Sequence, residues 1–464
     1  MNIIILGAGK VGSHLTNELS LQNHDILVID HDKDVLNRLL EQNDVMALEG
    51  DGTDLSILQE ANVGACDLFI ALTRNDDTNL ISAALAKSLG TSDIIIRLRD
   101  SRYLNHTQQI QQITGSKLII NPEYLAAKEI QRSIKYSHAR NVQTFLEDRA
   151  MMFEITIGAN SKLAGEKLAD ADSYLDQFGV LIGMVRYNGT ITIPNGDFVL
   201  EAGQKIYVMG TKTDVDKFYK AEIPENIRVK DALIIGASTL AHQLTGLLLE
   251  RNFNVTVIEL DREKAISIQE RYGGAVVINA DGSDPDILEE ARINSFDSVI
   301  SLTGIDEENI LIALIAQRWG IDKIIAKVNR TNLLKLTGIL DIDATFTPKS
   351  AASNYINRLV RSKYDAMGVS TLNNLYKLEG DEVEVLEFEV SEKSRIFNQR
   401  LKDLDMKAGT LVAIIEHSEY GGKIEVATGE SKIDMGDRVL VITKDKNITK
   451  IDDILEDFCK YWQL

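Results

Sequence analysis

The chain contains two long segments that repeat one pattern at a nearly constant spacing. An apolar run at residues 2–6 leads into Gly7-Ala8-Gly9-Lys10-Val11-Gly12, and a second apolar run at 232–235 leads into Gly236-Ala237-Ser238-Thr239-Leu240-Ala241. The offset is 229 residues at the first glycine of each segment (236 minus 7). Because the register persists far beyond these segments, the repeat indicates duplication of a whole domain rather than a short-repeat solenoid.

Each copy alternates short β-branched runs with amphipathic stretches. In the first copy, the strand-like runs are 2–6, 25–30, 45–49, 67–72 and 94–98. The helical stretches between them are 10–22, 33–43, 54–62 and 77–89. Residues 230–330 repeat this order, so the fold class is α/β, with two Rossmann-like, doubly wound parallel sheets.

The pattern changes after about residue 150, where apolar and polar residues alternate between turn signals. Residues 384–445 repeat this second pattern, so a small α+β (β-rich) domain follows each Rossmann-like domain. The chain is therefore predicted to contain four domains, 1–137, 138–225, 226–365 and 366–464.

The composition limits the classes of partner. The formal net charge is −20, from 70 acidic and 50 basic residues, which argues against nucleic acid as a partner and against docking on anionic lipid. The chain begins directly with a core strand and has no apolar run long enough to span a membrane. Its two cysteines lack metal-ligand spacing, and the seven histidines are scattered. We expect a cytoplasmic protein with no metal site and no catalytic residues.

The first glycine-rich segment has the spacing and the context of a dinucleotide-binding loop. Gly7 allows the tight turn after the strand, Gly9 lets the backbone approach a pyrophosphate, and Gly12 lets the helix pack closely on the strand. The helix N-terminus then offers N–H groups and partial positive charge to phosphates. The cofactor-binding residues predicted here are Gly7, Ala8, Gly9, Lys10, Val11 and Gly12.

Asp30 strengthens this prediction because it ends the second strand, 18 residues after Gly12. A carboxylate there can accept hydrogen bonds from ribose hydroxyls and repels a 2′-phosphate. The alternative is a helix cap or a solvated strand end. The carboxylate disfavours NADP, but NAD(H), ATP and ADP all carry a free ribose 2′-hydroxyl.

Further polar residues end the other strands of the first copy. Asp51 and Thr73 end the third and fourth strands at the carboxyl edge, where open α/β sheets bind ligands. Lys10, Arg74 and Arg97 bring three cations to the same edge, although each could also be an ordinary surface cation. The neighbouring run Asn75-Asp76-Asp77 fits N-capping of the next helix better than metal binding.

The second copy departs from the pattern where phosphate would bind. Ser238 replaces the middle glycine, while Thr239 and Gly304 replace Lys10 and Arg74, and one cation remains. This cleft looks suited to less phosphate charge or to no ligand. Its candidate residues are Gly236, Ser238, Glu259, Asp281, Thr303 and Lys327.

The duplicated segments resemble those of the TrkA family, which supplies the peripheral subunits of bacterial Trk potassium-uptake systems. The resemblance rests on the first glycine segment, Val28-Ile29-Asp30, Gly50-Asp51-Gly52-Thr53, Leu72-Thr73 and the duplication, and it covers essentially the full length. It implies tandem RCK units and a non-catalytic subunit that forms a tetrameric ring beneath a membrane-embedded channel subunit, on the cytoplasmic face of the inner membrane. It also implies that NAD(H), or alternatively ATP or ADP, binds in the Rossmann clefts and gates potassium flux.

Two other function classes remain open. An NAD-dependent oxidoreductase would need a substrate domain with a proton donor or acceptor, and residues 151–225 contain no histidine. A redox- or nucleotide-sensing transcription regulator would need a DNA-binding element, and the acidic chain shows no helix-turn-helix signature.

Overall fold

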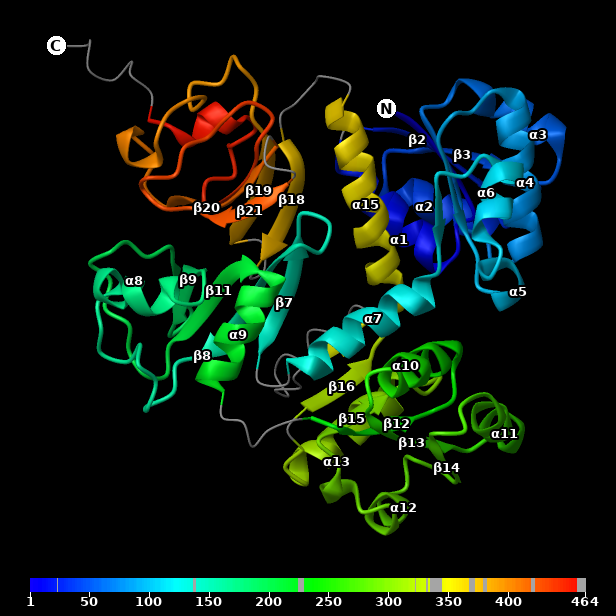
Figure 1. Ribbon diagram of the computed structural model, residues 1–464. Helices are drawn as coiled ribbons and strands as arrows, with labels where there is room; N and C mark the ends of the chain where they lie inside the picture. Colours follow the sequence, from blue (N-terminus) through cyan, green and yellow to red (C-terminus); the bar gives the residue numbers. More distant parts are fainter. Residues whose placement is uncertain are drawn as a thin grey trace. The chain divides into compact units, whose positions relative to one another are not determined.

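The chain forms two compact units, each built from two separate stretches of sequence (Figure 1). This computed structural model describes residues 1–22, 24–136, 139–223, 229–321, 323–330, 333, 344–366, 372–378, 382–418 and 422–456. Unit 1 comprises Met1–Lys135 and Val229–Leu359, and unit 2 comprises Tyr136–Arg228 and Val360–Leu464. The domain boundaries predicted at 137/138 and 225/226 lie outside the described residues.

The first half of unit 1 is a six-stranded parallel sheet in the order β3-β2-β1-β4-β5-β6. The strands are β1 (Asn2–Leu6), β2 (Asp25–Asp30), β3 (Met46–Glu49), β4 (Leu68–Ala71), β5 (Ile94–Arg97) and β6 (Leu118–Ile120). The helices are α1 (Lys10–Ser20), α2 (Lys33–Gln42), α3 (Leu55–Glu60), α4 (Asp76–Leu89), α5 (Ser101–Leu104), α6 (Thr107–Thr114) and α7 (Pro122–Lys135), with the 3₁₀ helix η1 (Val63–Ala65). The strand order reverses between β1 and β4, and open α/β sheets bind ligands at the carboxyl ends of the strands at such a point.

The second half of unit 1 repeats this sheet in the order β14-β13-β12-β15-β16-β17. The strands are β12 (Asp231–Ile235), β13 (Asn254–Glu259), β14 (Val276–Asn279), β15 (Ser298–Ser301), β16 (Lys323–Lys327) and β17 (Ala344–Phe346). The helices are α10 (Thr239–Leu249), α11 (Arg262–Arg271), α12 (Pro285–Glu290), α13 (Asp306–Arg318) and α15 (Pro348–Ala366), with η2 (Ile293–Ser295). The predicted pair of doubly wound parallel sheets is confirmed, and each gains a sixth strand of only three residues.

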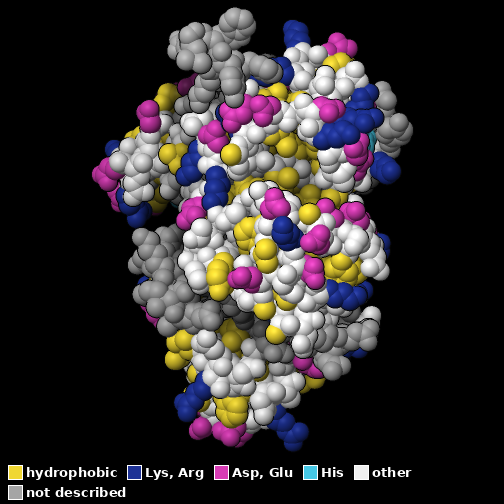
Figure 2. Space-filling view, turned by 90° about the vertical axis from the view of Figure 1, so that its left-hand side faces the viewer, with side chains coloured by type: hydrophobic (Ala, Val, Ile, Leu, Met, Phe, Trp, Pro, Cys, Tyr) yellow, Lys and Arg dark blue, Asp and Glu magenta, His cyan; other side chains and the backbone are white. Residues whose placement is uncertain are grey.

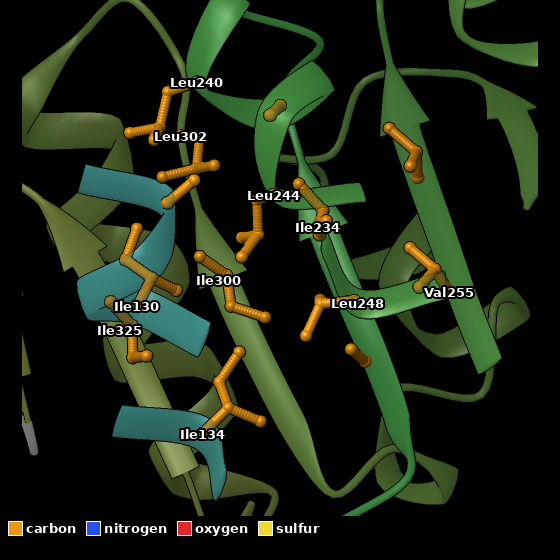
Figure 3. Packing of buried hydrophobic residues seen from close by; sticks show 14 of the residues in the cluster. Ile130, Ile134, Ile234, Leu240, Leu244, Leu248, Val255, Ile300, Leu302 and Ile325 are labelled. Carbon is orange, nitrogen blue, oxygen red and sulfur yellow. The ribbon is translucent and has the colours of Figure 1, made fainter. Parts of the chain in front are cut away.

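Helix α7 follows the first sheet but packs into the core of the second. Its side chains Ile130 and Ile134 lie among Leu244, Leu248 and Ile300, as Figure 3 shows. The Gln131 amide also donates a hydrogen bond to the Leu247 carbonyl at 2.6 Å. Helix α7 therefore belongs to the apolar core of the second fold, while the first sheet has a core cluster of its own.

Helix α15 makes the reciprocal contact with the first fold. Asn357 of α15 is hydrogen-bonded to Glu18 of α1, and the Ser350 hydroxyl lies 3.4 Å from His14 Nε2. Each fold thus sends the helix after its last strand onto the other fold.

Unit 2 contains two five-stranded antiparallel sheets, in the orders β10-β9-β11-β8-β7 and β18-β19-β22-β20-β21. The first consists of β7 (Arg140–Phe145), β8 (Ala150–Thr156), β9 (Val180–Tyr187), β10 (Thr190–Thr192) and β11 (Lys205–Thr211), with α8 (Leu168–Asp176) and α9 (Lys212–Glu222). The second consists of β18 (Leu372–Leu378), β19 (Val383–Glu389), β20 (Thr410–His417), β21 (Lys423–Val426) and β22 (Arg438–Thr443), with η3 (Leu401–Asp403) and η4 (Ile451–Ile454). The predicted small β-rich domains are confirmed.

The two sheets of unit 2 share a core. Phe145 and Met152 from the first sheet lie in one apolar cluster with Val385 and Ile442 from the second. Beside this core, the Glu416 carboxylate forms ion pairs with Arg149 and Arg438, which come from the two different halves. The duplicated halves are therefore joined within each unit.

Within the described residues, no helix is both long enough and apolar enough to cross a membrane. In the same residues, no group of three or more His, Cys, Asp or Glu side chains could hold a metal ion. On the face shown in Figure 2, Lys and Arg side chains lie interspersed with Asp and Glu side chains.

Candidate functional site

The glycine-rich loop after β1 combines two glycines that the fold requires with one that leaves space. Gly7 has φ +101°, and a Cβ there would lie 2.8 Å from the Thr73 nitrogen. A Cβ on Gly12 would lie 1.9 Å from the Gly7 carbonyl oxygen, whereas a Cβ on Gly9 would meet no atom within 4 Å. Gly12 therefore permits close packing of α1, and Gly9 keeps open the space that a pyrophosphate needs.

The N-terminus of α1 adjoins this open space. Gly9 is the N-cap residue, and no side chain caps the helix there. The loop thus offers backbone N–H groups and the positive end of a helix dipole, a combination that binds phosphate. The residues present fit the phosphate groups of a nucleotide.

Asp30 lies where the sequence predicts it, at the end of β2 beside the loop. Its Oδ2 accepts a hydrogen bond from the Ala8 N–H at 2.5 Å, and its Oδ1 accepts one from the Asp32 N–H at 3.0 Å. The carboxylate therefore positions the glycine loop itself. Ribose binding by Asp30 remains a prediction.

Asp51 forms a turn of its own after β3. Its Oδ1 accepts hydrogen bonds from the Thr53 N–H and hydroxyl, each at 2.8 Å, and these bonds lower the pKa of the exposed carboxyl. Asp281 forms the same turn with Ser283 in the second copy. The turn is therefore common to both copies and does not distinguish their clefts.

Thr73 is held by Asn79, a buried residue of α4 that the sequence analysis missed. The Asn79 Oδ1 accepts hydrogen bonds from the Thr73 N–H at 2.9 Å and the Thr73 hydroxyl at 2.7 Å. Its Nδ2 donates to the carbonyls of Thr73 and Arg97, so one side chain joins the ends of β4 and β5. Asn309 makes the equivalent bonds to Thr303 and Lys327. The shared 230-residue offset (309 minus 79) was the signal available in the sequence.

Asp76 is a second positioning residue. Asn75 caps α4 through bonds to the N–H groups of Asp77 and Thr78, as predicted. Asp76 instead accepts the N–H groups of Arg99 and Asp100, both at 2.8 Å, and so fixes the backbone after β5.

The three cations predicted at the first cleft have different surroundings, and their convergence on one ligand stays a prediction. The exposed Arg74 lines a hollow of about 350 Å³. Arg97 is only 7% exposed and pairs with Glu123, while the exposed Lys10 lies close enough to Lys327 of the second fold to lower the pKa of that lysine. The residues that line the hollow are Arg74, Asp76, Arg99, Asp100 and Thr239. Arg99, which the sequence analysis did not single out, lines the hollow with Arg74.

The glycine-rich loop after β12 resembles the first loop, but a side chain caps the helix that follows it. Gly236 keeps the turn with φ +98°, and Glu259 accepts the Ala237 N–H as Asp30 accepts that of Ala8. The Ser238 hydroxyl, however, caps α10 by accepting the Ala241 N–H at 3.4 Å. One of the N–H groups that the start of α10 could offer to a phosphate is thus already paired.

Lys327, the remaining predicted cation of the second cleft, is half-buried. Its Nζ donates to the Leu302 carbonyl at 3.2 Å. Burial is the main cause that lowers the pKa of Lys327, the nearby Lys10 lowers it further, and Asp306 opposes both. The second cleft therefore has a capped helix and a cation bonded to backbone.

Comparisons with known proteins agree with the duplicated architecture. The TrkA-N domain model matches residues 3–122 and 232–348, and the TrkA-C domain model matches 152–222 and 385–456. The chain is 31% identical over 454 residues to a Trk system potassium uptake protein TrkA homolog of Archaeoglobus fulgidus, covering 98% of this chain and 100% of that protein. It is 27% identical to the Haemophilus influenzae Trk system potassium uptake protein TrkA, covering 98% and 99%.

Solved structures share the fold. The GsuK RCK domain matches with a TM-score of 0.61 at 18% identity, covering 96% of this chain and 92% of that one. The GsuK channel bound to NAD matches with a TM-score of 0.62 at 18% identity, covering 96% and 77%. With both domain types matched twice and a relative of equal extent at 31% identity, the chain belongs to the TrkA family.

Proposed function

We propose that this chain is the peripheral regulatory subunit of a Trk-type potassium transporter, in which nucleotide binding controls potassium flux through a membrane-embedded subunit. The observation that carries the proposal is the uncapped N-terminus of α1 beside Gly9, with Asp30 at the adjacent strand end. Full-length similarity to Trk potassium uptake proteins supplies the transport context.

The ligand of the first cleft is NAD(H), with ATP or ADP as the alternative. The Asp30 carboxylate disfavours the 2′-phosphate of NADP and suits a ribose with two free hydroxyls. A solved channel of the same fold is bound to NAD, which supports this choice. The ligand would be held by the loop from Gly7 to Gly12, by Asp30, and by Arg74 at the hollow.

Regulation follows from linked equilibria. A nucleotide that binds one conformation of the subunit better than another shifts the population toward the first. The differential affinity sets the size of the shift, typically about 1–3 kcal/mol of coupling per site. Several copies in one assembly would multiply the effect.

We propose that a second copy of the chain covers an apolar stripe that occurs on α4 and again on α13. Ile81, Leu85 and Leu89 lie four residues apart along α4, and Ile81 is 49% exposed. Leu311 and Ile315 of α13 and Trp319, its C-cap residue, repeat this spacing, with Leu311 50% exposed; Leu85, Leu89 and Ile315 are half-buried against the cores of their own folds. Residues spaced by four share one helix face. Because both folds present the same face, copies can meet in a closed ring, and we propose a homotetramer on the cytoplasmic side of the membrane.

An enzymatic role is not proposed. The polar side chains described at the first cleft bind backbone: Asn79 holds Thr73, and Asp76 holds the segment after β5. Turnover of a 2-hydroxy acid or an aldehyde with NAD would favour the oxidoreductase alternative.

Titration calorimetry with NADH, NAD, ATP, ADP and NADPH tests the proposal. We expect binding of at least one nucleotide with a free 2′-hydroxyl, weaker binding of NADPH, and at least about tenfold loss of affinity in Gly9→Ser, the residue found in the second loop. Gly9→Ser should leave the Tm unchanged, because the added side chain enters open space. Potassium flux through the assembled transporter should then change with the nucleotide; identical flux with every nucleotide would contradict the proposal.

A further inference from the structure

Two arginines after β5 share one carboxylate at the start of α7. The Glu123 Oε1 lies 3.3 Å from Arg97 Nη2 and 2.9 Å from Arg99 Nη2. Arg97 ends β5 at the ligand-binding edge of the first sheet, and Arg99 lines the hollow with Arg74. The cluster of Arg97, Arg99 and Glu123 therefore joins the carboxyl edge of the first sheet to α7.

Arg97 is buried, Glu123 and Arg99 are partly buried, and the three side chains are incompletely paired. Within the described part of the chain, Arg97 Nε, Arg99 Nε and Glu123 Oε2 are buried atoms without a hydrogen-bond partner. Burial lowers the pKa of Arg97, and Glu123 opposes that effect. Buried charged groups with unused donors and acceptors cost free energy. Replacing the ion pairs of Glu123 by contacts that satisfy the arginines better would therefore cost little stability.

Helix α7 carries any change at Glu123 into the second fold. Glu123 lies in its first turn, where a carboxylate is also favoured by the helix dipole. Further along, Ile130 and Ile134 pack in the core of the second fold (Figure 3). After Lys135 the chain enters unit 2. A shift of this helix therefore acts on both the second fold and the connection to unit 2.

The second copy lacks the cluster. Lys349 stands at the position of Glu123, directly after the proline that starts α15, and Lys327 stands at that of Arg97. Asn329 replaces Arg99 and donates to Asp306 Oδ1 at 3.0 Å. Two lysines cannot form an ion pair with each other, so the ion-pair cluster occurs in the first copy and not in the second.

We propose that an anionic group of the nucleotide in the first cleft competes with Glu123 for Arg99 and Arg97, and that binding thereby releases the first turn of α7. The inference rests on the proposed function, since it assumes that the first cleft binds a nucleotide. The competition makes binding and the ion pair mutually exclusive: weakening the hold of Glu123 on the arginines strengthens nucleotide binding, up to the factor by which the ion pair reduces it in the wild type.

The test combines a charge-removing variant with two measurements on the full chain. Glu123→Gln should bind NADH at least about fivefold more tightly in calorimetry, because the arginines no longer have a competing carboxylate. Hydrogen exchange of residues 122–135 should become faster in the wild type when NADH is added, and should no longer respond in Glu123→Gln. A purely structural ion pair predicts equal or weaker NADH binding.

Asp93→Asn is the matched control. Asp93 pairs with Lys117 at 2.6 Å in the same fold, beside the opposite end of β5, so this variant removes an ion pair without touching the cluster. It should leave both NADH affinity and the exchange response at the wild-type level. Unchanged or weaker NADH binding by Glu123→Gln, or a wild-type exchange response in that variant, overturns this inference. Absence of any nucleotide binding by the wild type overturns the proposed function and, with it, the inference.

Discussion

The two Rossmann-like folds of unit 1 have the same strands in the same order, but the helix after the glycine-rich loop is uncapped in the first fold and capped in the second. In the first fold, Gly9 leaves the N-terminus of α1 uncapped and open. In the second, Ser238 caps α10 with its own hydroxyl. The two copies thus keep the same fold, but the single difference between Gly9 and Ser238 decides whether a side chain binds the free N–H groups at the start of the helix. An uncapped helix N-terminus is a cost that a bound phosphate can offset.

The largest expected effect concerns the close packing of α1. Gly12→Ala places a Cβ 1.9 Å from the Gly7 carbonyl oxygen, whereas the second fold already carries Ala241 at this position. We expect Gly12→Ala to destabilise the protein by about 3 kcal/mol, measured by urea denaturation. The reverse change, Ala241→Gly, should cost only about 1 kcal/mol. Equal costs in the two folds would contradict the difference in packing.

The next effect comes from the asparagine that joins two strand ends in each fold. Asn79→Ala and Asn309→Ala each remove hydrogen bonds to buried backbone, so each should cost about 2 kcal/mol in unfolding free energy. Only Asn79→Ala should weaken nucleotide binding, because only the first cleft is open. If both variants lost nucleotide affinity alike, the two clefts would be functionally equivalent.

A smaller difference separates the two halves of unit 2. His417 lies with Nδ1 2.9 Å from Asp437 and Nε2 3.1 Å from Glu425, whereas Tyr187, Gln204 and Thr192 occupy the matching positions of the first half. Burial lowers the pKa of His417, but its bonds to Glu425 and Asp437, together with their charges, outweigh burial and raise the pKa above 6.5.

This raised pKa gives the second half of unit 2 a pH dependence. The stabilisation is fully present below pH 6.5, the ordinary value, and is lost as the pH rises through the higher pKa of the folded state. His417→Gln should therefore flatten the decrease in Tm between pH 6 and pH 9. The surrounding charges include Lys423 opposite His417 on β21, and Glu416 and Arg438 on β20 and β22, and these remain unchanged in the variant. A wild-type pH profile in the variant would contradict this assignment.

The smallest effect comes from uncapping the second helix. Ser238→Gly should cost only about 0.3 kcal/mol, because glycine is a tolerated N-cap. We expect it to create a second nucleotide-binding event that is weaker than the first, since Thr239 and Gly304 supply no cation. If calorimetry detects no nucleotide binding at the second cleft of Ser238→Gly, the missing cations, and not the serine cap, explain why that cleft binds no nucleotide.

The sequence was sufficient for the fold and for the glycine loop because both follow from local rules. Continuous apolar runs predicted the parallel strands, and the spacing of Gly7, Gly9 and Gly12 predicted the loop. Sequence alone placed Lys10, Arg74 and Arg97 together at one sheet edge. Sequence alone did not show that Arg97 pairs with Glu123, on a helix after β6, or that Lys10 lies near Lys327 of the other fold, because these contacts depend on tertiary packing.

The positioning residues were missed for a related reason. Asn79 and Asp76 lie in a segment whose polar residues are all compatible with capping, and only the fold shows that Asn75 caps while the other two bind the strand ends. The repeat of Asn79 as Asn309 was visible in the sequence, but repetition alone does not identify the partner atoms.

The central claim, one strong nucleotide site per chain, is tested most directly by calorimetry of NADH with wild type, Asp30→Ala and Glu259→Ala. The two substitutions are matched, because each carboxylate accepts a loop N–H in its own fold. The account predicts one strong site per chain in the wild type, its loss in Asp30→Ala, and its retention in Glu259→Ala. Two equal sites in the wild type, or loss of strong binding in Glu259→Ala alone, would contradict it.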